Sequence, residues 1–185
     1  AFDIRNLCWS REIFEAAGID MGLMAKPVST GTVAGTISLA AVQKTGLCGD
    51  TKVVSVSHDQ VSAAVVARAF DGSVAVDGAG TVECLTPVYD QIPDIDVMYQ
   101  GYFSVVPYVI PGKYVAYAFS YTGGALMQWC TETLAKKEMQ LAKEQGISVN
   151  EYLEQAYASQ KEEIPSGLLV LPHFAGAATP YMDTG

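Results

Sequence analysis

The stretch from residue 52 to residue 70 constrains the fold of this chain more than any other. It begins with Lys-Val-Val-Ser-Val at 52–56, whose β-branched side chains predict a buried strand. A polar turn, Ser-His-Asp-Gln at 57–60, follows directly, and small apolar residues then predict a helix that ends near Phe70. Strand, polar turn and helix in this order are typical of α/β proteins, in which ligands bind at the carboxyl ends of strands.

Helical and extended segments alternate along the rest of the chain. Ser10 and Gly18 are placed to begin and end one helix, and Ser38 and Gly46 to begin and end another. Further helices are predicted from Ala125, over 131–145 and over 148–161, strands over 73–76, 82–85, 102–106, 113–121 and 168–171, an extended segment over 27–37, and loops over most of 87–111. The predicted fold class is therefore α/β.

Composition and charge exclude several classes of protein and partner. Half of the chain is apolar and only 17% is charged, which excludes intrinsic disorder. The net charge of −9 argues against nucleic acid and anionic membranes as partners, because phosphate binding needs clustered Lys and Arg. It does not argue against a nucleotide, whose phosphates can be held by backbone N–H groups and a metal ion.

The sequence also carries no sign of a membrane span or of a built-in metal site. No apolar run reaches the roughly 18 residues that a transmembrane helix needs, and no signal peptide is recognisable. Cys8, Cys48, Cys84 and Cys130 lie far apart, so we expect buried thiols in a reducing cytoplasm rather than zinc ligands. A Cys48 nucleophile with His58 as its base is a much weaker alternative.

Asp59 is the strongest candidate for a catalytic residue. If Ser57 caps the predicted helix, Asp59 takes the second helical position, where the helix dipole favours the ionised carboxylate. The same position lies at the end of the predicted sheet where ligands bind. A general base that takes a proton from a hydroxyl group needs both the ionised carboxylate and this position. The alternative is structural, because an Asp in a first turn is stabilising and Ser57 with Gln60 has the pattern of a capping box.

Two glycine segments are candidates for contact with phosphate. The bend Asp-Gly-Ala-Gly-Thr at 77–81 could cradle phosphate oxygens with its N–H groups. It contains no Lys and a strand follows it, so it is neither a Walker loop nor a dinucleotide fingerprint. The pair Gly123-Gly124 opens a predicted helix and offers a second place where a ligand could approach the backbone. Each segment alone also has a plain structural interpretation, as a hairpin turn and as a helix start.

Taken in order, these motifs resemble those of the FGGY carbohydrate kinases, a family that includes xylulokinases, gluconokinases and glycerol kinases. The segments that carry the resemblance are 2–10, 29–37, 53–60, 78–81, 124–129 and 166–180. The resemblance covers nearly all of the chain but only the middle of a family protein. The chain also begins without Met and stops in mid-turn, so we expect a piece of a longer protein.

The resemblance implies roles for individual residues. Asp59 is implied to be the catalytic base, and Gln60 to hold substrate hydroxyls. His58 stands where the family commonly has a glycine and is expected to shape the sugar pocket. The residues implied to contact the nucleotide are Gly78, Ala79, Gly80, Thr81, Gly124, Met127 and Gln128.

The implied fold is the actin-like (ribonuclease H-like) sugar kinase fold, with two domains and the active site between them. Residues 1–70 would end the first domain and residues 71–185 would begin the second. ATP and Mg²⁺ are the implied cofactors, and a sugar or polyol, first of all a xylulose-like ketose, is the implied substrate. Because the family's metal-binding Asp and most of its sugar contacts lie outside this stretch, we expect the isolated chain to be inactive.

Departures from the family pattern keep two alternatives open. Ala79 stands where the family has a threonine, and Ala177 and Ala178 replace a common Glu-Arg pair. These changes favour a non-catalytic regulator that binds a nucleotide or a sugar with the same fold. The other alternative is an interaction module that binds a partner through the charged helices of 131–161, and a homodimer is also left open.

Overall fold

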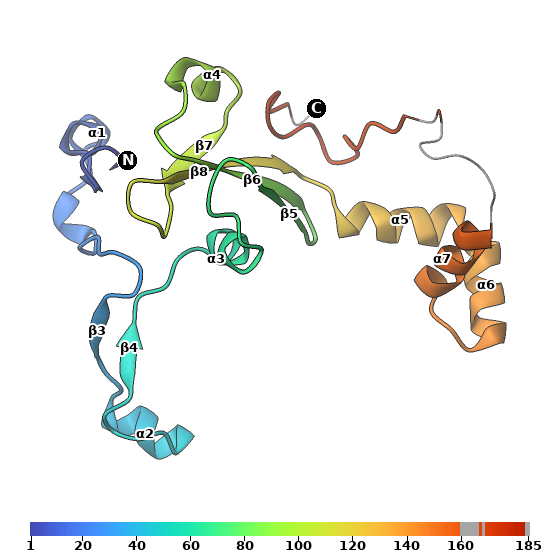
Figure 1. The fold of residues 1–185 in the computed structure, drawn as a ribbon, viewed down its shortest axis with the longest axis horizontal. Helices are drawn as coiled ribbons and strands as arrows, with labels where there is room; N and C mark the ends of the chain where they lie inside the picture. The colour runs from blue at the N-terminus through green and yellow to red at the C-terminus, as the bar shows by residue number, and fades with distance from the viewer. Residues whose placement is uncertain (160–166, 168, 184–185) are drawn as a thin grey trace. The chain divides into compact units, whose positions relative to one another are not determined.

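The computed structural model describes residues 1–159, 167 and 169–183. Its helices and strands alternate along the chain, which confirms the α/β class (Figure 1). Residue contacts divide the chain into two units, which we call the first and the second. The first comprises Ala1–Val76, Thr86–Met98 and Ser104–Tyr117, and the second comprises Asp77–Leu85, Tyr99–Phe103 and Ala118–Gly185.

The elements are short. In chain order the strands are β1 (Phe2–Asp3), β2 (Cys8–Trp9), β3 (Val33–Thr36), β4 (Lys52–Val54), β5 (Ala75–Ala79), β6 (Glu83–Tyr89), β7 (Ser104–Pro107) and β8 (Tyr114–Ser120). The helices are α1 (Arg11–Ala17), the 3-10 helix η1 (Met21–Leu23), α2 (Leu39–Thr45), α3 (Asp59–Val66), α4 (Ile95–Gln100), α5 (Gly124–Leu134), α6 (Lys136–Gln145) and α7 (Val149–Ser159). β1 pairs with β2 and β3 with β4, both antiparallel, while the other four strands form a sheet in the order β5-β6-β8-β7.

Helices α1 and α2 begin and end where their caps predict. The side chains of Ser10 and Ser38 each accept a hydrogen bond from an N–H in the first turn, at 3.4 and 3.3 Å. Gly18 and Gly46 end the two helices with φ of 67° and 72°, a left-handed conformation that glycine adopts without a side-chain clash. Local sequence is enough to set both ends of these helices.

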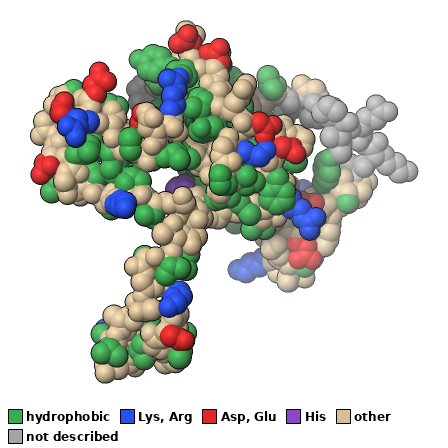
Figure 2. All heavy atoms as spheres, turned by 60° about the vertical axis from the view of Figure 1, so that its left-hand side comes forward, with side chains coloured by type: hydrophobic (Ala, Val, Ile, Leu, Met, Phe, Trp, Pro, Cys, Tyr) green, Lys and Arg blue, Asp and Glu red, His purple; other side chains and the backbone are tan. Residues whose placement is uncertain are grey.

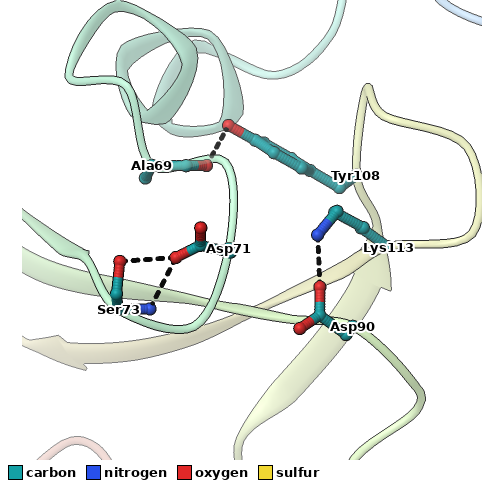
Figure 3. Close-up of polar contacts among 6 residues, drawn as sticks. All are labelled: Ala69, Asp71, Ser73, Asp90, Tyr108 and Lys113. Carbon is teal, nitrogen blue, oxygen red and sulfur yellow. Dashed lines mark hydrogen bonds and ion pairs between the residues drawn. The ribbon is translucent and has the colours of Figure 1, made fainter.

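The core of the first unit forms where α3 packs on the sheet. Its buried members are Val61, Ala64, Ala69, Val88, Tyr108 and Val115. The Tyr108 hydroxyl donates to the carbonyl oxygen of Ala69 at 2.9 Å (Figure 3). Burial raises the pKa of this phenol, which therefore stays a neutral donor. The helix is thus fixed both by apolar packing and by one buried hydrogen bond just beyond its end.

Two polar contacts close the loops around this core (Figure 3). Asp71 accepts hydrogen bonds from the hydroxyl and the backbone N–H of Ser73. These bonds, led by the one from the hydroxyl, lower the pKa of the Asp71 carboxyl. Lys113 forms an ion pair with Asp90.

The segment from β3 through α2 to β4, which we call the arm (residues 33–54), is built differently. Val33 pairs with Val54 and Thr36 with Lys52, and the register shifts by a bulge between Val33 and Gly35. Every residue of both strands is exposed. The prediction of a buried strand over 52–56 is therefore wrong about burial, and the observed strand is shorter.

The predicted helix after this strand also needs correction. The N-cap of α3 is His58 and not Ser57, so Asp59 is the first helical residue rather than the second. The helix ends at Val66, short of Phe70, and Arg68 then takes a positive φ of 58°. Ala69 lies beyond the end of the helix but is buried in the core. Apolar periodicity cannot distinguish such a buried residue from a further turn of helix, so the predicted helix was too long.

Elsewhere the prediction missed elements that depend on tertiary contacts. Helix α4 lies in the region predicted as loops, and β6 extends through Pro87. The charged region predicted from Thr131 is divided at Ala135 between α5 and α6. Residues 169–171 form no strand. Two further positions lie outside the described residues: Leu168, the predicted start of that strand, and Lys161, the predicted end of the last helix.

The cysteines are only partly as predicted. Cys84 is buried and Cys130 half-buried, but Cys8 and Cys48 are exposed. Many hydrophobic side chains are also exposed, several of them on the face drawn in Figure 2. None of the helices within the described ranges is long and apolar enough to cross a membrane.

Candidate functional site

Asp59 stands at the start of α3 as an exposed carboxylate on a firmly anchored helix. The side chains of His58 and Asp59 are 65% and 86% exposed. Only two residues further on, Val61 is 1% exposed, and Ala64 is completely buried. Because the same helical turn enters the core, the carboxylate is open to solvent while the backbone that carries it is held in place.

One oxygen of Asp59 is engaged by its neighbours. The Gln60 N–H donates to Asp59 Oδ1 at 2.7 Å, and His58 Nδ1 lies 2.9 Å from the same oxygen. The His58 ring also contacts the ring of Tyr117 on β8, with centroids 5.8 Å apart. The contacts of His58 are thus with Asp59, Gln60 and Tyr117, and the structure does not support its alternative role as a base for Cys48.

Gln60 carries a buried acceptor that lacks a donor. Its side-chain oxygen Oε1 is buried and has no hydrogen-bond partner among the described residues. Leaving a buried polar atom unpaired costs about 1–3 kcal/mol. The unpaired oxygen therefore favours a site in which a bound molecule supplies the missing hydrogen-bond donor. A hydroxyl group has the required chemistry.

In the second unit, the structure brings the two glycine segments together. The Gly124 N–H donates to the carbonyl oxygen of Gly80 at 2.7 Å, and the Gly123 N–H donates to that of Thr81 at 3.1 Å. The Gly80 N–H is itself bonded to the Val82 carbonyl at 2.9 Å. Gly78 and Ala79 belong to β5, so the four-residue motif is half strand and half turn.

Close approach of backbone to backbone explains the glycine pair. A Cβ on Gly123 would lie 2.9 Å from the Val82 carbonyl carbon, and a Cβ on Gly124 would lie 2.9 Å from the Gly80 oxygen. Side chains at these positions would meet main-chain atoms that cannot move aside. The glycine pair was predicted to allow close approach of a ligand, and the neighbour in this structure is the 80–82 turn of the protein itself.

Met127 and Gln128 follow on α5 within the next turn. Positions three and four residues after Gly124 lie on its side of the helix. Met127 is exposed, and the Gln128 side-chain amide donates to Glu132 Oε1 at 2.8 Å. Gly124, Met127 and Gln128 thus form one exposed strip that begins at the glycine turn.

A pocket in the second unit was not anticipated from the sequence. Its volume is about 320 Å³, and its polar lining includes Asp77, Glu83, Ser120 and His173. Thr179 forms part of the wall and bonds the backbone of Phe119 through its hydroxyl, which accepts at 2.7 Å and donates at 3.1 Å. Asp77 begins the glycine bend and Glu83 follows it. That bend is the only sequence signal that could have drawn attention to the pocket.

Comparison with known proteins identifies relatives of the whole chain. Residues 1–66 match the N-terminal domain of the FGGY family of carbohydrate kinases. The chain is 24% identical over 182 residues to a xylulose kinase of Lactococcus lactis, covering 98% of this chain and 33% of the relative. It is 28% identical over 180 residues to an autoinducer-2 kinase of Yersinia pestis, covering 94% of this chain and 32% of the relative.

A solved structure agrees with these sequence relatives. The gluconate kinase of Lactobacillus acidophilus superimposes with a TM-score of 0.76 at 22% identity, covering 99% of this chain and 34% of that one. The chain thus spans about a third of the length of the proteins it matches. The expected sugar kinase fold is confirmed, and residues 1–66 match the FGGY family of carbohydrate kinases, which the sequence motifs resemble.

Proposed function

We propose that the protein to which this chain belongs transfers the γ-phosphoryl group of ATP to a hydroxyl group of a sugar or polyol. The observation that carries the proposal is Asp59, an exposed carboxylate at the start of a helix that is anchored in the core by Val61 and Ala64. A general base needs this combination of access and fixed position. The kinase relatives supply the type of reaction.

In the proposed reaction, Asp59 accepts the proton of the acceptor hydroxyl. The hydroxyl oxygen forms its bond to the γ-phosphorus as the bond from that phosphorus to the bridging oxygen of ADP breaks. The Gln60 N–H, which donates to Asp59 Oδ1, stabilises the carboxylate before the proton arrives. The orphaned oxygen of Gln60 accepts a hydrogen bond from a substrate hydroxyl, which orients the acceptor.

Mg²⁺ is expected to accompany ATP, and the described residues do not by themselves form a metal centre. The described ranges contain no group of three His, Cys, Asp or Glu side chains able to hold a metal ion. Mg²⁺ is commonly bound by one or two carboxylates together with the substrate phosphates. We therefore expect the protein ligand of the metal to come from outside these residues.

The nucleotide is proposed to lie along the exposed strip of the second unit. Gly80 and Thr81 adjoin Gly124, and Met127 and Gln128 continue the same side of α5. The acceptor is proposed to be a polyhydroxylated chain, with a xylulose-like ketose first. The relatives are named for three different substrates, xylulose, autoinducer-2 and gluconate, so the panel to be tested must be wide.

The proposed domain boundary follows residue 70. The family match ends at residue 66, which supports a first domain ending near that point, with residues 71–185 beginning the second. The exposed arm and the many exposed hydrophobic side chains support the view that further protein covers this chain. We therefore propose that the isolated chain is inactive. We also propose that the full-length protein acts in the cytoplasm, where ATP is abundant.

The test is ADP release by the full-length protein across a panel of ketoses, aldonates and polyols. Asp59→Asn should lower the rate roughly 10²- to 10⁴-fold, as the loss of a general base does. Asp96→Asn is the matched control, because Asp96 is an exposed carboxylate in the first turn of another helix, α4. Equal turnover of the wild type and Asp59→Asn would remove Asp59 from the role of base.

A second candidate function is a regulator that binds ATP or a sugar without turnover. Ala79, which stands where the family has a threonine, and Ala177 and Ala178, which replace a common Glu-Arg pair, favour this candidate. It predicts saturable binding of ATP or a sugar by the full-length protein, with no ADP released on any member of the panel.

A further inference from the structure

His58 and Asp59 share a contact that distinguishes the two oxygens of the carboxylate. His58 Nδ1 lies 2.9 Å from Asp59 Oδ1, and the Gln60 N–H donates to the same oxygen at 2.7 Å. Asp59 Oδ2 has no hydrogen bond within the described part of the chain. One oxygen is therefore held from two sides, and the other faces solvent.

The distances around His58 Nδ1 bear on which ring nitrogen carries a proton. The Gln60 N–H lies 2.7 Å from Asp59 Oδ1 but 3.4 Å from His58 Nδ1, so its main acceptor is the carboxylate. The bond that Nδ1 accepts from the Gln60 N–H is therefore the longer of the two, whereas a bare Nδ1 at 2.9 Å from a carboxylate oxygen would set two lone pairs against each other. A protonated imidazole removes this repulsion, because the contact with Asp59 Oδ1 is then an ion pair.

The surroundings of the ring keep it in that orientation. The Tyr117 ring on β8 lies against the imidazole at an interplanar angle of 55°. Tyr117 is half-buried and packs against the core that also holds α3. The imidazole is therefore placed between a strand of the sheet and the carboxylate, although much of its edge is exposed.

We propose that His58 is a positioning residue: its Nδ1–H holds Asp59 Oδ1, so that Oδ2 is the oxygen that takes the proton from the acceptor hydroxyl. This role rests on the proposed function of Asp59 as base and adds to it. It differs from a role in binding the sugar, because a positioning residue acts on the transition state through Asp59. Its removal lowers kcat, whereas removal of a sugar contact raises KM.

Two substitutions of nearly equal polarity separate these roles. His58→Asn places an amide N–H close to the position of the imidazole Nδ1, and Asn is also a favoured N-cap residue. His58→Gln carries the same amide one methylene further out, near the position of Nε2. Because the His58 side chain is mostly exposed, we expect both variants to fold, and thermal unfolding checks this.

The expected result in the full-length protein is that His58→Gln lowers kcat by roughly 10- to 100-fold, as small misplacement of a catalytic group does. The KM for the sugar should stay within about twofold, and His58→Asn should recover most of kcat. In an Asp59→Asn background, His58→Gln should cause no further loss, because the residue that it positions is already disabled.

Several outcomes overturn the inference. An unchanged kcat in His58→Gln, or a raised sugar KM at unchanged kcat, removes the positioning role while leaving the base intact. Equal loss in His58→Asn and His58→Gln shows that the donor position does not matter and contradicts the proposal. If Asp59→Asn keeps full turnover, the proposed function fails first, and the role of His58 fails with it.

Discussion

At the start of α3 the predicted site residues are exposed side chains, whereas at the start of α5 they are backbone groups that are already bonded to a neighbouring turn. Asp59 presents its carboxylate to solvent, and Val61 anchors the same turn in the core. Gly123 and Gly124 lack side chains, and their N–H groups donate to the carbonyls of residues 80 and 81. No residue of α5 is buried.

The difference shows two ways of fixing a functional group. On α3, packing of the apolar side chains positions the helix and leaves its polar end free for chemistry. On α5, the absence of a Cβ allows contact between two main chains, and hydrogen bonds across that contact position the helix. A substitution that enlarges a side chain should therefore disturb the placement of α5, whereas one that shrinks a buried side chain should disturb the placement of α3.

The largest effect on stability is expected at the glycine pair. In Gly123→Ala the new methyl group would lie 2.9–3.0 Å from main-chain atoms of Val82 and Gly80, which cannot move without opening the turn. We expect the free energy of unfolding to fall by about 3 kcal/mol, at the upper end of the cost of overpacking. Chemical denaturation of the full-length protein measures this loss of stability. The KM for ATP should rise in the same variant.

Gly49→Ala is the matched control for this substitution. Nothing lies within 4 Å of a Cβ built on Gly49. The stability of this variant should match the wild type within about 0.5 kcal/mol. If the two alanine variants are equally stable, close backbone approach is not what places α5.

A smaller effect is expected from shrinking the core side chain under Asp59. Val61→Ala removes two buried methyl groups, at about 0.8 kcal/mol per group, and leaves a cavity, so we expect a loss of about 2 kcal/mol. Chemical denaturation is again the measurement. Val66→Ala, on the same helix but 85% exposed, should leave stability almost unchanged. Equal losses in both variants would contradict anchoring of α3 by its buried side.

Removal of a single hydrogen bond beyond α3 should have a still smaller effect. Tyr108→Phe leaves the ring in the core but removes the hydroxyl that donates to Ala69. We expect a loss of about 1 kcal/mol, the usual net contribution of such a bond. Tyr99→Phe is the control, because Tyr99 is 82% exposed. A thermal unfolding midpoint unchanged in both variants would show that packing alone holds this end of the segment.

The parts of the fold that were predictable are those set by local sequence. Ser10, Gly18, Ser38 and Gly46 fix the ends of α1 and α2 through bonds and dihedral angles within a few residues. Burial could not be predicted in the same way. The valine-rich strand β4 is exposed, because whether a strand is covered depends on contacts that residues 52–56 do not encode.

The candidate site was predictable to a similar extent. Asp59 was placed at a helix start from its neighbours alone, although the cap is His58 and not Ser57. The contact between the Gly80 turn and Gly124 joins segments more than forty residues apart, so no local pattern could reveal that it is made by the protein's own backbone. The position of His58 against Tyr117 was hidden for the same reason.

The smallest expected effect concerns pH and the turn that follows the α3 segment. The Ser73 hydroxyl and N–H hold the pKa of Asp71 below the ordinary value of 3.8. A lowered pKa in the folded state stabilises the protein above the unfolded-state value, and this contribution is lost as pH falls through the folded value. Ser73→Ala removes the larger cause, so it should be slightly less stable than the wild type at pH 7. Because Asp71 is exposed, the gap should be small, and denaturation curves should converge as both proteins are taken well below pH 3.8. A gap that stays constant over this range would mean that the Ser73 hydroxyl acts through the turn and not through the charge of Asp71.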